Sequence, residues 1–186
     1  MSDRSTIRIF VSSPSDVRPE RLIAERVIKR LAREFAYRFD VQAVLWERVP
    51  LLATSDFQTL TTPPSETDIV IVILWSRLGV VPPAPTVGRL SKRPVTGTEF
   101  EFEDAFAGYR EKEFPHLLLY RRQAEIVVKL GDRAQVEEQQ RQSELVEDFM
   151  MRWTRDAECR AFTAANWPFL DGAAFESMVE ARRANQ

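Results

Sequence analysis

The stretch that decides the fold is ETDIVIVILWSRLG, residues 66 to 79. Its centre, Ile69 to Trp75, is the longest uninterrupted apolar run in the chain and is mostly β-branched. It shows no alternation of apolar and polar side chains, which is typical of a strand buried on both faces of a parallel sheet. The run is also far too short to cross a bilayer. We therefore predict a central strand, with Ser76, Arg77 and Gly79 following its carboxyl end.

Strands and helices alternate on both sides of this stretch. Apolar side chains recur at helical spacing between the predicted strands, and turn-forming residues separate the segments. This order favours an α/β fold, a flavodoxin-like doubly wound five-stranded parallel sheet of order 2-1-3-4-5 with helices on both faces. We predict one domain over residues 1–186 with a core at about 7–183. The other strands are expected at 7–11, 41–46, 117–120 and 160–163, and helices at 17–39, 55–60, 98–110, 134–153 and after Asp171.

The composition excludes several classes of partner. A chain of 186 residues with 44% hydrophobic and 29% charged residues is typical of a globular domain with one buried core. Its net charge of -2 gives no overall field for phosphate backbones or anionic lipid, so we predict neither nucleic acid nor membrane as a partner. One cysteine, Cys159, and one histidine, His116, exclude an internal disulfide and a His/Cys zinc site. We predict a cytoplasmic protein without a metal site.

The strand order brings several candidate residues to one edge of the sheet. In a sheet of order 2-1-3-4-5 the chain reverses direction between the first and third strands, and ligands bind beyond the carboxyl ends there. The serines also suit turns and helix caps, and the tryptophans also suit core or rim packing, so a structural function and a binding function stay open for both. The candidate substrate-binding residues at this edge are Ser12, Ser13, Trp46, Trp75, Ser76 and Arg77.

A second group of candidates lies in TGTEFEFEDA, residues 96 to 105, where four carboxylates crowd the start of a predicted helix. One interpretation is structural, because Thr98 and Glu101 have the spacing of a capping box and acidic residues favour a helix N-terminus. The other is chemical. Glu101 lies one helical step from Phe102, beside the buried stripe, where its carboxylate can border a cleft and stabilise a cation developing at a sugar carbon.

Other enzyme classes lack their motifs. The chain has no G-x-G-x-x-G after a strand, no G-x-x-x-x-G-K-[ST] and no G-x-S-x-G. A dinucleotide dehydrogenase, a phosphate-loop nucleotidase and an α/β-hydrolase are therefore disfavoured. His116 follows Pro115 at a strand start, where a structural role is expected.

Four segments together resemble a TIR-like domain: IFVSSPSD at 9–16, VLWE at 44–47, DIVIVILWSRLG at 68–79 and TGTEFEFEDA at 96–105. More narrowly, they are similar to the bacterial TIR-like domains that open multidomain proteins with NACHT-type STAND ATPase modules, or with WD or tetratricopeptide repeats. The resemblance covers about residues 7 to 170.

The resemblance implies a signalling or antiphage-defence effector that hydrolyses NAD at the nicotinamide–ribose bond when assembled. NAD, or a related nucleotide, would be a substrate rather than a cofactor. In TIR domains the catalytic glutamate precedes an apolar residue and usually has a small residue four positions on, as Glu101, Phe102 and Ala105 do here. Glu101 is thus the first choice and Glu99 the second, although Gly97 and Thr98 replace the Trp-Cys pair that commonly precedes the glutamate.

The resemblance also implies partners. VLWERVPLLA at 44–53 occupies the place of the loop through which TIR domains bind each other, so homotypic self-association is expected, as is fusion to a NACHT/STAND or repeat module. Two alternatives remain. One is a non-catalytic interaction domain, in which the carboxylates only cap a helix and the surface at 46–54 mediates self-association. The other is a nucleoside deoxyribosyltransferase-like enzyme, which shares the architecture and a key glutamate.

Overall fold

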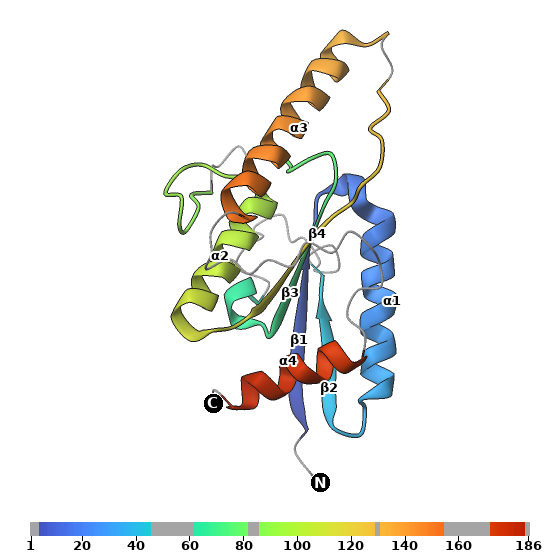
Figure 1. Cartoon of the computed structure of the whole chain (residues 1–186), viewed down its shortest axis with the longest axis vertical. Helices are drawn as coiled ribbons and strands as arrows, with labels where there is room; N and C mark the ends of the chain where they lie inside the picture. Colours follow the sequence, from blue (N-terminus) through green and yellow to red (C-terminus); the bar gives the residue numbers. More distant parts are fainter. Residues whose placement is uncertain (1–3, 46–61, 82–85, 129–130, 155–171, 185–186) are drawn as a thin grey trace, which may run out of the picture.

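A parallel sheet runs through the described part of the chain, which in this computed structural model comprises residues 4–45, 62–81, 86–128, 131–154 and 172–184 (Figure 1). Its strands lie in the order β2-β1-β3-β4. The strands are β1 (Ser5–Ser12), β2 (Phe39–Val44), β3 (Ile69–Leu74) and β4 (His116–Arg121). The helices are α1 (Arg18–Glu34), α2 (Gly97–Lys112), α3 (Arg133–Thr154) and α4 (Gly172–Ala184), with short 3-10 turns η1 (Ser15–Val17) and η4 (Pro64–Glu66).

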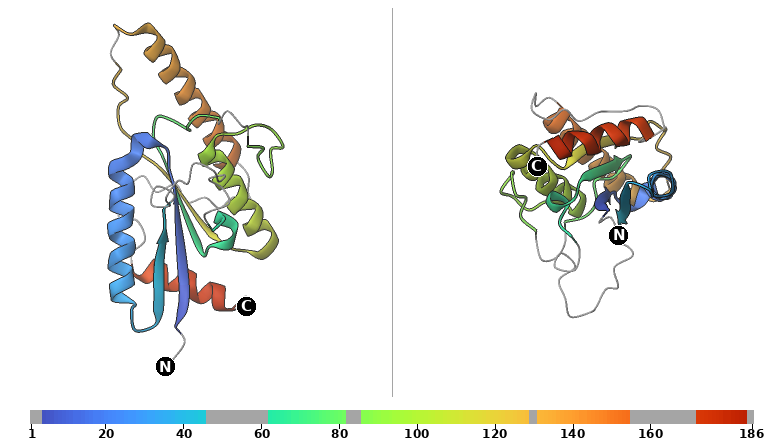
Figure 2. Two further views of the ribbon diagram at one scale, coloured as in Figure 1. Left: turned by 180° about the vertical axis from the view of Figure 1, so that it is seen from behind. Right: turned by 90° about the horizontal axis from the view of Figure 1, so that it is seen from below.

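The central strand β3 is buried on both faces, as its sequence predicts. Ile69, Ile71 and Ile73 belong to a core that β3 shares with α1 and α4. Val70, Val72 and Leu74 alternate with them and pack into a second core with α2 and α3. Helices therefore cover both faces of the sheet, and the two views in Figure 2 show α1 on one side and α2 with α3 on the other.

The register of the sheet places β1 beside β3 at the carboxyl edge. Residues Ile9 to Ser12 pair with Ile69 to Val72 in parallel. β3 continues for two further residues and pairs with β4 up to Arg121. Ser12 is therefore the last residue of β1, next to the centre of β3, at the point where the order of strands changes direction.

The expected α/β fold and the order of these four strands are confirmed, while some bounds differ. The helix predicted over 17–39 ends at Glu34, because the chain turns through Phe35, whose carbonyl accepts the amide protons of Arg38 and Phe39 at 2.9 Å each. β2 consequently starts at Phe39 rather than at residue 41. The predicted strand at 160–163, the short helix at 55–60, Asp171 and Cys159 lie outside the described residues. No helix in the described ranges has the length and apolar character needed to span a membrane.

The docking of α4 gives a first testable prediction. Phe175 is fully buried, and its ring centroid lies 5.1 Å from that of Phe35 and 6.3 Å from that of Phe39. Phe175→Ala should lower the free energy of unfolding by about 3 to 5 kcal/mol, because it leaves a cavity between α4 and the sheet. Tyr37→Ala is the matched control, since that ring is 73% exposed and its loss should change stability little. Denaturant unfolding measures both, and equal effects would contradict this packing.

Candidate active site at the carboxyl edge of the sheet

The structure brings Ser12 and Glu101 into direct contact. Ser12 is fully buried at the end of β1, and its hydroxyl donates a hydrogen bond of 2.5 Å to Oε2 of Glu101 in the second turn of α2. The two residues lie 89 positions apart in the sequence. They meet because α2 starts at the carboxyl edge of the sheet and runs back along it, as Figure 1 shows.

The N-terminus of α2 is capped by a different residue from the one predicted. Thr96, not Thr98, is the N-cap: its hydroxyl oxygen accepts from the Glu99 amide at 3.2 Å and donates to the Leu78 carbonyl at 3.0 Å. The expected Thr98–Glu101 capping box is therefore wrong, because the N-cap lies two residues earlier and Thr98 is already inside the helix. The carboxylate of Glu101 has no part in capping and points to β1 instead.

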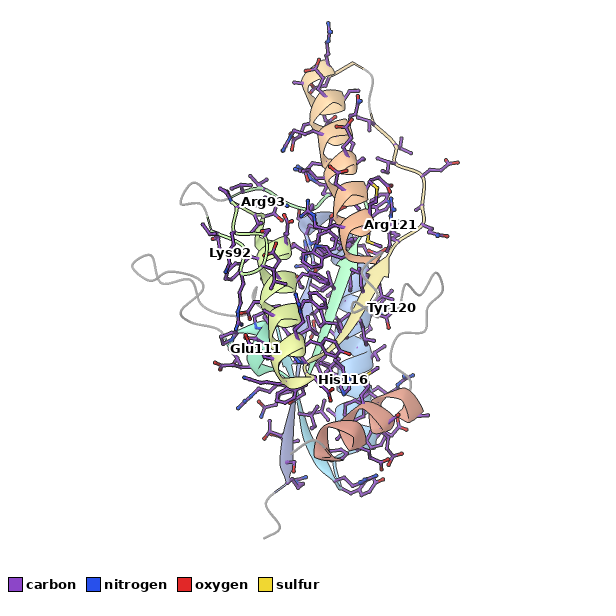
Figure 3. All side chains as sticks on the ribbon, turned by 60° about the vertical axis from the view of Figure 1, so that its left-hand side comes forward. Lys92, Arg93, Glu111, His116, Tyr120 and Arg121 are labelled. Carbon is purple, nitrogen blue, oxygen red and sulfur yellow. The ribbon has the colours of Figure 1, made fainter. Side chains whose placement is uncertain are left out.

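Glu99 is held by two arginines. Its Oε1 accepts from Arg93 at 2.5 Å and from Arg152 of α3 at 2.9 Å, and its side chain is 3% exposed. Figure 3 shows Arg93 on the segment that leads into α2. Burial raises the pKa of Glu99 above its ordinary value, although the two guanidinium groups oppose this. These contacts make Glu99 a link between the loop, α2 and α3.

The two remaining carboxylates of the cluster also hold backbone. Glu103 is fully buried and accepts from the amides of Leu90 and Ser91 at 2.8 and 2.9 Å, so it anchors the loop that precedes α2. Asp104 accepts from the amide of Ser65 at 2.9 Å and from Arg89 at 3.1 Å. Each has a structural function that the sequence pattern alone does not distinguish from that of Glu101.

Glu101 has a different electrostatic environment. Burial raises the pKa of its carboxyl group to about 7, while the Ser12 hydrogen bond and the positive charge of Arg21 lower that pKa less strongly. A carboxyl group with such a pKa exists in both protonation states near neutral pH. This is the range in which acid–base or electrostatic catalysis by a glutamate is effective.

Arg21 is a site residue that the sequence analysis missed. It is only 5% exposed, and its guanidinium donates to Ser13 Oγ at 2.7 Å and to the Pro14 carbonyl at 2.8 Å. It thereby fixes the backbone that follows Ser12. One feature of the sequence could have identified Arg21. It lies three and seven positions before Ala24 and Ile28, so it shares the buried face of α1 with them. A cation on such a face needs polar partners, and the end of β1 supplies them.

The predicted residues after β3 have different positions. Ser76 donates from its amide at 2.9 Å and its hydroxyl at 3.0 Å to Asp16 Oδ2, which ties the end of β3 to the loop after β1. Trp75 packs against the α1 side of the sheet, where the Arg122 guanidinium lies 4.1 Å from its ring centroid. Its indole nitrogen donates to the Ala124 carbonyl at 3.1 Å.

These contacts favour the packing interpretation of Trp75. Arg77 lies 3.6 Å from Glu138 of α3, so it is also directed to another element. Trp46 lies outside the described residues. The structure thus gathers Ser12 and Glu101 with Ser13 and Arg21 beside them, and it engages Trp75 and Arg77 elsewhere.

Metal ligands do not cluster here. Among the described residues, no group of three or more His, Cys, Asp or Glu side chains has an arrangement that can hold a metal ion. His116, labelled in Figure 3 at the start of β4, has its Nε2 atom 2.9 Å from the Met178 carbonyl of α4. That contact gives His116 a structural function.

Comparison with known proteins yields no relative: no family model, curated protein or solved structure matches the chain.

The environment of Glu101 predicts how stability depends on pH. Its pKa of about 7 in the folded protein lies above the ordinary value of 4.5, so the folded state retains a proton that the unfolded chain releases. Stability is therefore lost as pH rises from about 4.5 to about 7. Glu101→Gln removes this loss and should be more stable than the wild type by about 1 to 3 kcal/mol at about pH 8, with a smaller gain at about pH 5.

Urea unfolding of both proteins across this pH range measures the effect. Glu111→Gln is the control, because Glu111 lies exposed at the other end of α2 (Figure 3). A pH-independent difference between the wild type and Glu101→Gln would show that the carboxyl group of Glu101 is not desolvated in the folded protein.

Proposed function

We propose that this chain is a TIR-like effector domain that hydrolyses NAD at the nicotinamide–ribose bond when it is assembled, with a function in signalling or antiphage defence. The observation that carries the proposal is the contact between Ser12 and Glu101 at the carboxyl edge of the sheet. It lies where doubly wound folds bind their ligands, between the first and third strands. The resemblance of the four sequence segments to TIR-like domains supports the same glutamate.

The other carboxylates of the cluster support this choice. Glu99, Glu103 and Asp104 each accept hydrogen bonds that hold the loop before α2 or its neighbours. Glu101 contacts only a neutral hydroxyl by a side-chain hydrogen bond among the described residues. A substrate that replaces or joins Ser12 at this carboxylate does not have to break the fold. The costly burial of an acid without a directly bonded cation is typical of functional sites.

The proposed reaction uses the charge of Glu101. As the bond between C1′ of the ribose and the nicotinamide nitrogen breaks, its electron pair leaves with nicotinamide, which becomes neutral. The sugar then gains oxocarbenium character, which the Glu101 carboxylate stabilises. Water adds to C1′ and releases a proton, giving ADP-ribose. Ser12 orients the carboxylate, and Arg21 holds the backbone around Ser12.

The decisive measurement is the release of nicotinamide from NAD by the domain at high concentration or fused to an oligomerising scaffold. Glu101→Gln keeps the size of the side chain and removes its charge, so it should lower turnover by about a hundredfold or more. Glu111→Gln, on the exposed end of the same helix, should leave turnover unchanged. Absence of release under every assembled condition, or equal release from wild type and Glu101→Gln, would refute the proposal.

The pH profile tests the chemical state of Glu101. Because the carboxylate is the active form, kcat/KM should rise with pH around a midpoint of about 7. Ser12→Ala removes a hydrogen bond that favours the charged form, so it should move this midpoint to higher pH as well as reduce the rate. Ser15→Ala, an exposed serine of the same loop, serves as the control. If the midpoint of the Ser12→Ala variant is unchanged, Ser12 does not hydrogen-bond to the carboxylate that controls the rate.

A further inference from the structure

Gln142 of α3 is a fully buried polar side chain with a complete set of hydrogen bonds. Its Oε1 atom accepts from the amides of Leu78 and Gly79 at 3.1 and 3.3 Å. Its Nε2 atom donates to the Gly79 carbonyl at 3.0 Å and to the Glu138 carboxylate at 2.9 Å. A glutamine side chain has two donor and two acceptor positions, and all of them are used here. This pairing offsets the cost of burying the polar group.

Gln142 is also the first buried residue of α3. The residues before it in this helix, 133 to 141, are exposed or partly exposed, and Figure 1 shows this half of α3 projecting beyond the sheet. The following half packs on the core through Val146, Phe149 and Trp153. Gln142 thus lies where α3 meets the body of the protein, beside the segment that follows β3.

The segment that follows β3 depends on Gln142 for its backbone hydrogen bonds. Leu78, which is 2% exposed, and Gly79 belong to no helix or strand, so a side chain has to accept from their amides. Gln142 provides that acceptor. A second glutamine of α3, Gln139, donates to the Ser76 carbonyl at 2.9 Å. Two side chains of α3 therefore hold the path of this segment.

Leu78 connects this segment to α2. Its carbonyl accepts from the hydroxyl of Thr96 at 3.0 Å, and the same hydroxyl oxygen accepts from the Glu99 amide at 3.2 Å as the N-cap of α2. Glu101 follows two residues later, and its carboxylate accepts from Ser12 at 2.5 Å. A continuous path of hydrogen bonds and backbone therefore joins α3 to the carboxylate of the candidate active site.

We propose that Gln142 is a positioning residue of the candidate active site, which holds the start of α2 so that Glu101 meets Ser12. This role rests on the proposed function of Glu101 and adds a side chain from a third element of the fold. Groups that take part in catalysis have to be held within about 0.5 Å of their productive geometry by the residues around them. A fully paired, fully buried glutamine suits that purpose, because it has little freedom to move.

The rest of α2 has anchors of its own. Phe102 and Phe106 pack against Phe149 and Trp153 of α3, with ring centroids 5.0 Å apart in the first pair and 5.3 Å apart in the second. Loss of the glutamine should therefore leave α2 on the core and loosen only the start of the helix.

Carbon-13 NMR of the glutamate carboxyl groups tests this role without any substrate. Comparison with Glu101→Gln identifies the Glu101 signal, whose titration midpoint in the wild type should be about 7. Gln142→Met keeps the length of the side chain and removes its hydrogen bonds. It should lower the Glu101 midpoint by at least about half a pH unit, because water then reaches a carboxyl group whose pKa is raised by burial. Loss of the Ser12 hydrogen bond acts in the opposite direction, but desolvation has the larger effect on this pKa.

The same variant should also release nicotinamide from NAD at least about tenfold more slowly, since a small displacement of a catalytic group is costly. Gln140→Met is the matched control, because Gln140 lies exposed on the same helix, where it donates to Glu144 at 3.2 Å. The control should match the wild type in both measurements.

Thr96→Val interrupts the same path at its other end, because it keeps the shape of the side chain and removes the hydroxyl. It should lower the Glu101 midpoint as well, and adding Gln142→Met should change the midpoint little further, since both act through Leu78. The NMR spectra also show whether each variant is folded. An unchanged midpoint in either folded variant, or shifts that add in full, would overturn the proposal. A wild type that releases no nicotinamide refutes the proposed function alone, because the titration measures the role of Gln142 separately.

Discussion

The burial of β3 on both faces is the constraint on which the rest of the structure depends. Six consecutive apolar residues, Ile69 to Leu74, leave no polar face toward water, so helices have to cover both sides of the sheet. Covering both faces of a parallel sheet requires crossovers in two directions, and the change of direction falls beside β3. The contact between Ser12 and Glu101 forms there because α2 must start at the edge where β3 ends.

The four carboxylates at the start of α2 show how one pattern serves different purposes. Glu99 binds two arginines, Glu103 and Asp104 hold backbone amides, and Thr96 takes the cap. A helix start that is already capped and paired has no structural need for Glu101. The fold nevertheless places the half-buried carboxylate of Glu101 against a neutral hydroxyl, and the desolvation raises its pKa. The cost of this desolvation, together with the position of Glu101 beside Ser12 at the carboxyl edge of the sheet, is the physical reason for proposing a chemical role for this residue.

The sequence predicted those features that depend on local pattern. The apolar run of β3 and the amphipathic helices follow from periodicity, and Ser12 follows from its position at a strand end. The order of the strands came from the flavodoxin-like pattern of alternating elements, and the choice of Glu101 over Glu99 came from the resemblance to TIR-like domains. The sequence did not predict Thr96 as the cap, because two threonines, Thr96 and Thr98, each have a glutamate three positions later and so allow two capping frames. It also missed the contacts of Trp75 with Arg122 and of Arg21 with Ser13. These contacts join residues whose neighbours only the folded chain defines.

The net charge of the chain likewise does not tell which charges the fold brings together. A total of -2 predicts no long-range attraction to any charged partner, since opposite charges cancel at distances much larger than the molecule. At short range they do not cancel, because the fold brings particular charges together, as it brings Arg93 and Arg152 to Glu99. The total charge therefore gives no reason to expect a uniformly charged partner, and only the fold shows which charges meet.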